Sequence, residues 1–149
     1  MTITIISVGT KPGREMNLLM QDYVKRLPKH VTIQWRFIDH ASGNPKNSVT
    51  QESEAIMRIL TNGQKTILLD ETGYIISSPE LAKRVYATGE DCTFIIGGAY
   101  GVSEQLKQRA DFIWSLSNLV FPHQIVRLLL VEQLYRAYAI HIGHPYHHA

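Results

Sequence analysis

The stretch CTFIIGGAYG (residues 92–101) decides the fold, because it joins a short apolar run to a glycine-rich turn. Such a run is typical of a central strand that is covered on both faces. The glycines at positions 97, 98 and 101 allow close approach of the backbone to a ligand, although a plain tight turn would use them equally well. The turn fits neither the GxGxxG pattern nor the P-loop, so a ligand here is not expected to be held through a pyrophosphate.

Outward from this strand, the chain alternates between strand and helix patterns. Strands are expected over residues 3–8, 31–38, 65–70, 92–96 and 112–116. Helices are expected over residues 15–27, from Ser48 or Thr50 to about 60, from Ser78 to about 88, for a short distance after Ser103, and from Pro122 to about 142. This alternation predicts an α/β fold, with a mostly parallel sheet and helices on both faces. No repeat or linker divides the chain, so residues 1–149 are expected to form a single domain.

The composition is that of an ordinary globular protein, with 44% hydrophobic and 19% charged residues among 149. A formal net charge of +2 does not by itself indicate a nucleic-acid partner. Cys92 is the one cysteine, which excludes an internal disulfide. Since we find neither a signal peptide nor an apolar run long enough to cross a membrane, we expect a cytoplasmic protein with no membrane partner.

Two further segments follow predicted strands, and ligands of open α/β sheets bind beyond the carboxyl ends of strands. Residues 68–73 (LLDETG) end in two acids and a glycine, a pattern that a solvated turn would also show. Residues 114–123 (WSLSNLVFPH) combine apolar side chains with small polar ones and break at Pro122. A loop of this kind suits a flat adenine and a thioether better than a charged phosphate.

The last predicted helix is apolar around nearly its whole circumference. A small sheet can cover only part of such a helix, so the rest is expected to pack against a second copy in a homodimer. Glu132 and Arg136 are spaced for an ion pair, which is the structural alternative to anion or base recognition by Arg136. The tail HPYHH (residues 144–148) has no acidic or cysteine partners, so no metal site is expected there. An aromatic ring beside histidines suits stacking on a base and moving its proton.

Taken together and in this order, seven motifs resemble the RlmH family, the ribosomal large-subunit RNA methyltransferases that act on N3 of a pseudouridine. The motifs are VGTK (8–11), LLD (68–70), IGGxxG (96–101), LS to FPH (116–123), VR (126–127), EQLYRA (132–137) and HPYH (144–147). The resemblance covers essentially the whole chain, and the combination is more specific than any single motif.

The resemblance implies a SPOUT-type α/β fold with a C-terminal trefoil knot and S-adenosylmethionine as cofactor. The implied cofactor pocket is lined by Leu69, Gly98 and the loop of Ser117, Asn118, Leu119, Val120, Phe121 and Pro122. It also implies a homodimer in which each active site uses the tail of the other subunit. The implied substrate is 23S rRNA, and the low net charge fits recognition of the assembled ribosome better than of free RNA.

The proposed chemistry assigns a role to each of three residues. Pseudouridine N3 becomes a good nucleophile only as its proton leaves, whereas the sulfonium methyl is already activated and needs no metal. His147 is the candidate for assisting proton transfer, with bulk water as the alternative acceptor. Arg136 would stabilise the developing anion or hold a phosphate, and Tyr146 would position the base.

Two other classes of function remain open. One is a small-molecule enzyme on a nucleotide-binding α/β fold, which should carry a phosphate-binding fingerprint that this sequence lacks. The other is a non-catalytic RNA- or ribosome-binding module on the same fold. Such a module would bind ribosomes without affinity for S-adenosylmethionine.

Overall fold

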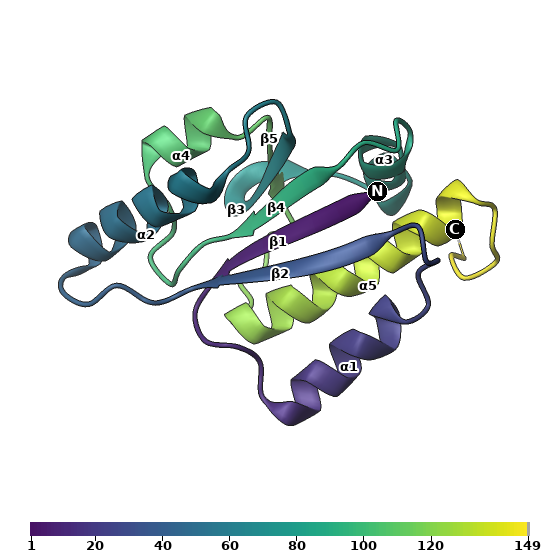
Figure 1. Cartoon of the computed structure of the whole chain (residues 1–149), viewed down its shortest axis with the longest axis horizontal. Helices are drawn as coiled ribbons and strands as arrows, with labels where there is room; N and C mark the ends of the chain where they lie inside the picture. Colours follow the sequence, from purple (N-terminus) through teal and green to yellow (C-terminus); the bar gives the residue numbers. More distant parts are fainter. Residues whose placement is uncertain (149) are drawn as a thin grey trace.

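The computed structural model describes residues 1–148, which form one five-stranded sheet with helices on both faces (Figure 1). The strands are β1 (Thr2–Val8), β2 (Thr32–Ile38), β3 (Lys65–Ile75), β4 (Cys92–Ile96) and β5 (Phe112–Ser115). The helices are α1 (Arg14–Val24), α2 (Pro45–Ile59), α3 (Ser78–Tyr86), α4 (Glu104–Arg109) and α5 (His123–His141). The strand order is β2-β1-β4-β3-β5, and every neighbouring pair is parallel. The α/β fold class expected from the sequence is therefore confirmed.

The apolar run at residues 92–96 is the central strand, as predicted. β4 pairs with β1 on one side and with β3 on the other, and all five of its residues are buried. Alternate side chains of the sheet point to opposite faces. Phe94 and Ile96 pack with α1, α3 and α5, whereas Ile95 packs with α2 and α4. These two apolar layers hold the helices on the sheet.

The capping residues of two helices differ from those expected from the sequence. The side-chain oxygen of Asn44 accepts a hydrogen bond from the backbone N–H of Asn47, so α2 begins at Pro45, ahead of the predicted caps Ser48 and Thr50. Proline suits this first turn, because its missing N–H would have no helical partner there. At α3 the cap is Ser77 rather than Ser78, and Glu80 completes a reciprocal capping box with it.

α5 runs antiparallel to β1 and β2 and extends along their length (Figure 1). It begins at the edge where the strands end and finishes near the start of β1, beside the N-terminus (Figure 1). Its buried stripe includes Leu130, Val131 and Leu134, whereas Ile125, Leu128 and Leu129 stay partly exposed. The sheet thus covers one side of α5, as expected. The threading of the C-terminal segment into a knot stays a prediction.

Candidate active site

A cavity of about 430 Å³ opens beyond the ends of β4 and β5, beside the middle of β3, where its pairing with β5 is irregular. It is lined by residues 69–72, 96–102, 114–117 and 119–121, together with Lys107, His123 and Val126. The three segments that sequence analysis singled out therefore meet around one cavity. Its volume lies in the range of sites for small molecules and cofactors.

Most of the predicted cofactor residues line this cavity. They are Leu69, Gly98, Ser117, Leu119, Val120 and Phe121. Asn118 and Pro122 belong to the same loop but are not part of the lining. The hydroxyl of Ser117 accepts a hydrogen bond of 3.1 Å from the backbone N–H of Leu119, which shapes the loop. Leu119 and Val120 are 70% and 82% exposed, so they present apolar surface that a ligand could cover.

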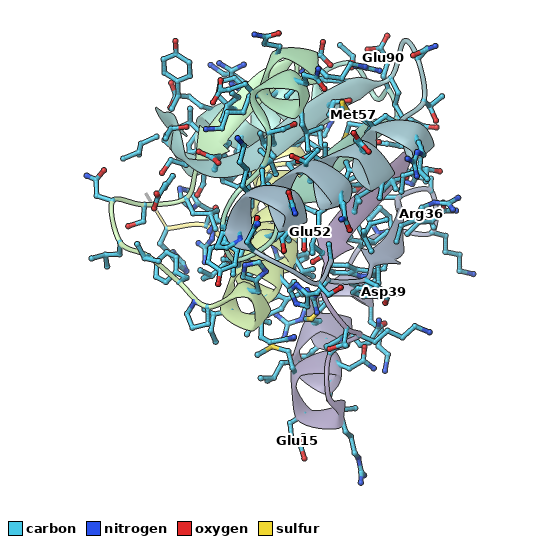
Figure 2. The ribbon with its side chains drawn as sticks, turned by 90° about the vertical axis from the view of Figure 1, so that its left-hand side faces the viewer. Glu15, Arg36, Asp39, Glu52, Met57 and Glu90 are labelled. Carbon is cyan, nitrogen blue, oxygen red and sulfur yellow. The ribbon has the colours of Figure 1, made fainter. Side chains whose placement is uncertain are left out.

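The glycine turn closes tightly against a carboxylate of α2. The backbone N–H of Gly101 donates to the carbonyl of Gly98 at 3.1 Å, and Gly101 has a φ of +82° that favours glycine. A Cβ atom at Gly98 would stand only 2.3 Å from Oε1 of Glu52, so no larger residue fits without movement. Figure 2 shows Glu52 on α2 near the middle of the view, while Glu15 projects from the end of α1.

Glu52 also holds the segment between β2 and α2. It is 6% exposed, and its Oε2 accepts a hydrogen bond of 3.0 Å from the backbone N–H of Ala41. The Nδ1 of His40 lies 3.7 Å from the same oxygen. No sequence pattern distinguished Glu52, because a lone acid in an amphipathic helix is ordinarily a solvated residue.

His123 stands at the first position of α5 and lines the cavity. Burial lowers the pKa of His123, and the guanidinium of Arg127 and the ring of His40 lower it further. The nearby carboxylate of Glu52 acts in the opposite direction. A neutral imidazole at a cavity wall offers one donor and one acceptor.

Arg127 is 1% exposed, and the acceptors around it are all on or beside the end of β1. Its Nε donates to the hydroxyl of Ser7 at 2.8 Å, and its terminal nitrogens donate to the carbonyls of Thr10 and Val8 at 2.7 and 3.2 Å. The ring of Phe37 lies 5.0 Å from its guanidinium carbon. Arg127 therefore ties α5 to the loop after β1, and its role is structural.

The predicted catalytic residues form a second cluster at the C-terminal end of α5. Arg136 pairs with Oε1 of Glu132 through Nε at 3.0 Å, and the hydroxyl of Tyr146 donates to the same oxygen at 3.1 Å. The Arg136 guanidinium carbon lies 4.8 Å from the Tyr146 ring centroid. NH1 of Arg136 lies 3.3 Å from Nδ1 of His147. The structure thus brings Arg136, Tyr146 and His147 together.

The electrostatics of this cluster follow from its contacts. Hydrogen bonding to Glu132 raises the pKa of Arg136, so its guanidinium stays charged. Burial raises the pKa of Tyr146 to about 12, and the charge of Glu132 adds to the effect. Since an arginine can only donate, Nδ1 of His147 must accept, and the proton of a neutral ring then sits on Nε2. In this arrangement His147 presents a donor at Nε2.

The cavity and the tail cluster cannot meet within one chain. His123 and Arg136 are thirteen positions apart on the continuous helix α5, which corresponds to about 20 Å at 1.5 Å per residue. The chain therefore carries the two predicted parts of the site at opposite ends of one helix.

Across residues 1–148, no group of three or more His, Cys, Asp or Glu side chains is arranged to hold a metal ion. Among the same residues, no helix combines the length and apolarity that a membrane span requires.

Comparisons with known proteins identify relatives over the full chain. A family model described as a predicted SPOUT methyltransferase matches residues 1–147. A Dictyoglomus thermophilum protein named ribosomal RNA large subunit methyltransferase H is 39% identical over 153 residues, covering 99% of this chain and 100% of its own length. A Chromobacterium violaceum protein of the same name is 38% identical, with 99% of each chain covered.

The fold is also found in solved structures, of which we give one. It is described as a probable methylase family protein from Haemophilus influenzae Rd KW20, and it superposes with a TM-score of 0.58. The identity is 10%, and the match covers 95% of this chain and 66% of that one. At this identity the likeness supports the fold alone.

Proposed function

Because this chain belongs to the SPOUT methyltransferase family, alongside the ribosomal RNA large subunit methyltransferases H, we propose that it methylates N3 of a pseudouridine in 23S rRNA. The proposed methyl donor is S-adenosylmethionine, and the proposed substrate is the assembled ribosome. The observation that carries the proposal is the single cavity in which Leu69, the glycine turn and the loop at residues 116–121 converge.

The residues around this cavity fit the proposed donor. Leu69, Leu119 and Phe121 offer apolar surface of the kind that accepts a flat base. The close packing of Gly98 leaves backbone, rather than a side chain, facing the cavity at that point. No pyrophosphate fingerprint is present, which suits a donor without phosphates. When bound, S-adenosylmethionine supplies a methyl group that its sulfonium has already activated.

The tail residues suit the acceptor base. Loss of the N3 proton leaves negative charge on the two flanking carbonyl oxygens of the base, and charged or N–H donors stabilise such charge. Arg136 supplies a guanidinium that Glu132 keeps oriented. His147, with its proton on Nε2, is suited to donate to an anionic oxygen, so water is the simpler acceptor of the N3 proton. Tyr146 would stack against or position the base.

A homodimer would join the two halves of the site. Since about 20 Å separates cavity and tail cluster on α5, the tail of one subunit would complete the cavity of its partner. The partly exposed apolar residues of α5, including Ile125, Leu128 and Leu129, provide surface for such an interface.

Two measurements test the proposed function. The first is calorimetric titration of the protein with S-adenosylmethionine, with Leu119→Asp as the cavity variant. Leu119 is exposed, so the change should leave the thermal midpoint unaltered while weakening binding by about tenfold or more through an unpaired charge in an apolar wall. The second is transfer of labelled methyl to ribosomes that lack the modification, followed by mapping of the methylated position.

Saturable binding and methyl transfer to N3 would establish the activity. Tight binding to ribosomes with no affinity for S-adenosylmethionine would instead favour the non-catalytic ribosome-binding module.

A further inference from the structure

We propose that Asp70 and Lys107 bind the amino-acid end of the methyl donor, with Lys107 recognising its α-carboxylate and Asp70 its α-ammonium. This inference rests on the proposed function and extends it, because it adds two side chains to a pocket otherwise described by apolar residues and backbone.

The cavity has two chemically different ends, set by the alternation of side chains along β3. Leu69 points to the α5 face and packs with the core that contains Trp114 and Leu116, both of which also line the cavity. Its neighbours in sequence point to the opposite face. Leu68 accordingly packs with the core beneath α2 and α4, and Asp70, two residues on, is on the side of α4, where Lys107 lies. The apolar end therefore faces α5 and the charged end faces α4.

Asp70 is oriented rather than freely solvated. Its carboxylate belongs to a side chain that is 11% exposed, and its Oδ1 accepts hydrogen bonds from the backbone N–H and the hydroxyl of Thr72 at 2.9 and 2.5 Å. Two donors on the same oxygen fix the plane of the carboxylate at the cavity wall.

Lys107 is positioned but not fully hydrogen-bonded. Its Nζ lies 3.8 Å from Oδ1 of Asp70 and 3.8 Å from Oε1 of Glu104, and its side chain is 21% exposed. Both distances exceed those of direct hydrogen bonds. An ammonium carries three donors, so within the described chain Lys107 retains capacity to donate to a ligand in the cavity.

The cation of Lys107 has one anionic match on the donor. S-adenosylmethionine carries a single carboxylate, which stands beside an ammonium at the end far from adenine. Lys107 is the one lysine or arginine among the residues that line the cavity. With adenine against the apolar wall near α5, the zwitterionic end would lie toward α4, beside a cation and an anion of complementary sign.

The test compares three ligands with the wild-type protein and Lys107→Gln by calorimetry. S-adenosylmethionine carries the α-carboxylate and the α-ammonium, and its decarboxylated form keeps the ammonium and the sulfonium but not the carboxylate. 5′-Methylthioadenosine lacks the amino-acid end and the sulfonium charge. Lys107→Gln should weaken binding of S-adenosylmethionine by about tenfold and leave the other two affinities unchanged. Lys107→Arg should restore most of the loss, and the exposed Lys83→Gln on α3 serves as the matched control.

The outcomes separate this inference from the function on which it rests. If Lys107→Gln weakens all three ligands equally, or none of them, the assignment of the amino-acid end is wrong while the donor site stands. If the wild-type protein binds none of the ligands, the proposed function is overturned and this inference with it.

Discussion

Position 98 shows how one residue ties the cavity to a helix distant in sequence. Because Oε1 of Glu52 stands 2.3 Å from where a Cβ would be, Gly98→Ala should lower the free energy of unfolding by about 1–3 kcal/mol. Urea denaturation followed by circular dichroism measures the change. Combining it with Glu52→Ala should cost less than the sum of the single changes, since the second substitution removes the clash. Strict additivity would show that Gly98 is constrained by something other than Glu52.

His123 gives the protein a dependence on pH in the mildly acidic range. Burial and the charge of Arg127 lower its pKa below the ordinary 6.5, so the unfolded chain takes up the proton first as the pH falls. The contribution to stability is therefore complete above about pH 6.5 and is lost progressively as the pH falls below it.

Urea denaturation above and below about pH 6.5 should show that acidification lowers the free energy of unfolding less in His123→Gln than in the wild type. His144→Gln, a change at an exposed tail histidine, should behave like the wild type. An equal loss in the His123 and His144 variants would assign the dependence to other groups.

Among the elements, α5 and β1 are joined by the buried guanidinium of Arg127. Arg127→Met keeps much of the side-chain volume but leaves the carbonyls of Val8 and Thr10 and the hydroxyl of Ser7 without their donor. The expected loss is about 3 kcal/mol in the free energy of unfolding, measured by urea denaturation. Arg58→Met removes an exposed pair with Glu54 and should change stability by less than about 0.5 kcal/mol. A similarly small effect at Arg127 would mean that water replaces its hydrogen bonds.

The helices and strands differ in how well their own local sequence predicts where they begin and end. The strand at residues 92–96 and the cap at Ser103 were predicted correctly, because burial on both faces and a side-chain cap each leave a local pattern. The extension of β3 to Ile75 was not predicted, since it depends on pairing with β5 beyond an irregularity after Leu69. α2 begins earlier than predicted, because Asn44 caps the helix in place of the later polar residues Ser48 and Thr50.

The residues of the site also differ in whether the sequence could predict their place. Its loops carry compositional signals, so the lining from Leu69 to Phe121 could be predicted. Glu52 and Lys107 could not, because their place at the cavity follows from helix packing and not from their neighbours in sequence.

For the whole molecule, the separation of cavity and tail on α5 predicts complementation between inactive variants. Leu119→Asp damages the cavity, and Arg136→Ala damages the tail, so each homodimer should show little methyl transfer when S-adenosylmethionine is kept well below the concentration that saturates the Leu119→Asp cavity. Co-expression under two affinity tags gives heterodimers with one doubly damaged and one intact site. A random mixture should recover about a quarter of wild-type activity, provided that each site takes its two halves from different subunits.

One control variant and one contrary outcome decide how this experiment is interpreted. Arg136→Ala alone should bind S-adenosylmethionine like the wild type, because Arg136 is proposed to act on the acceptor base and not on the methyl donor. If mixed subunits stay inactive although heterodimers form, each site is built within one chain and the composite arrangement is wrong.

The link between Arg127 and Ser7 joins positions 120 residues apart, and it has a consequence for the order of events during synthesis. The side of β1 that carries Ile3 and Ile5 packs with α5, which is synthesised long after β1. Until then Ile3 and Ile5 have no complete cover, and the loop after β1 has no guanidinium to hold it. Contacts of such long range slow folding and prolong the exposure of unfinished apolar surface. We therefore expect this side of β1 to stay incompletely packed in the nascent chain until α5 has been synthesised.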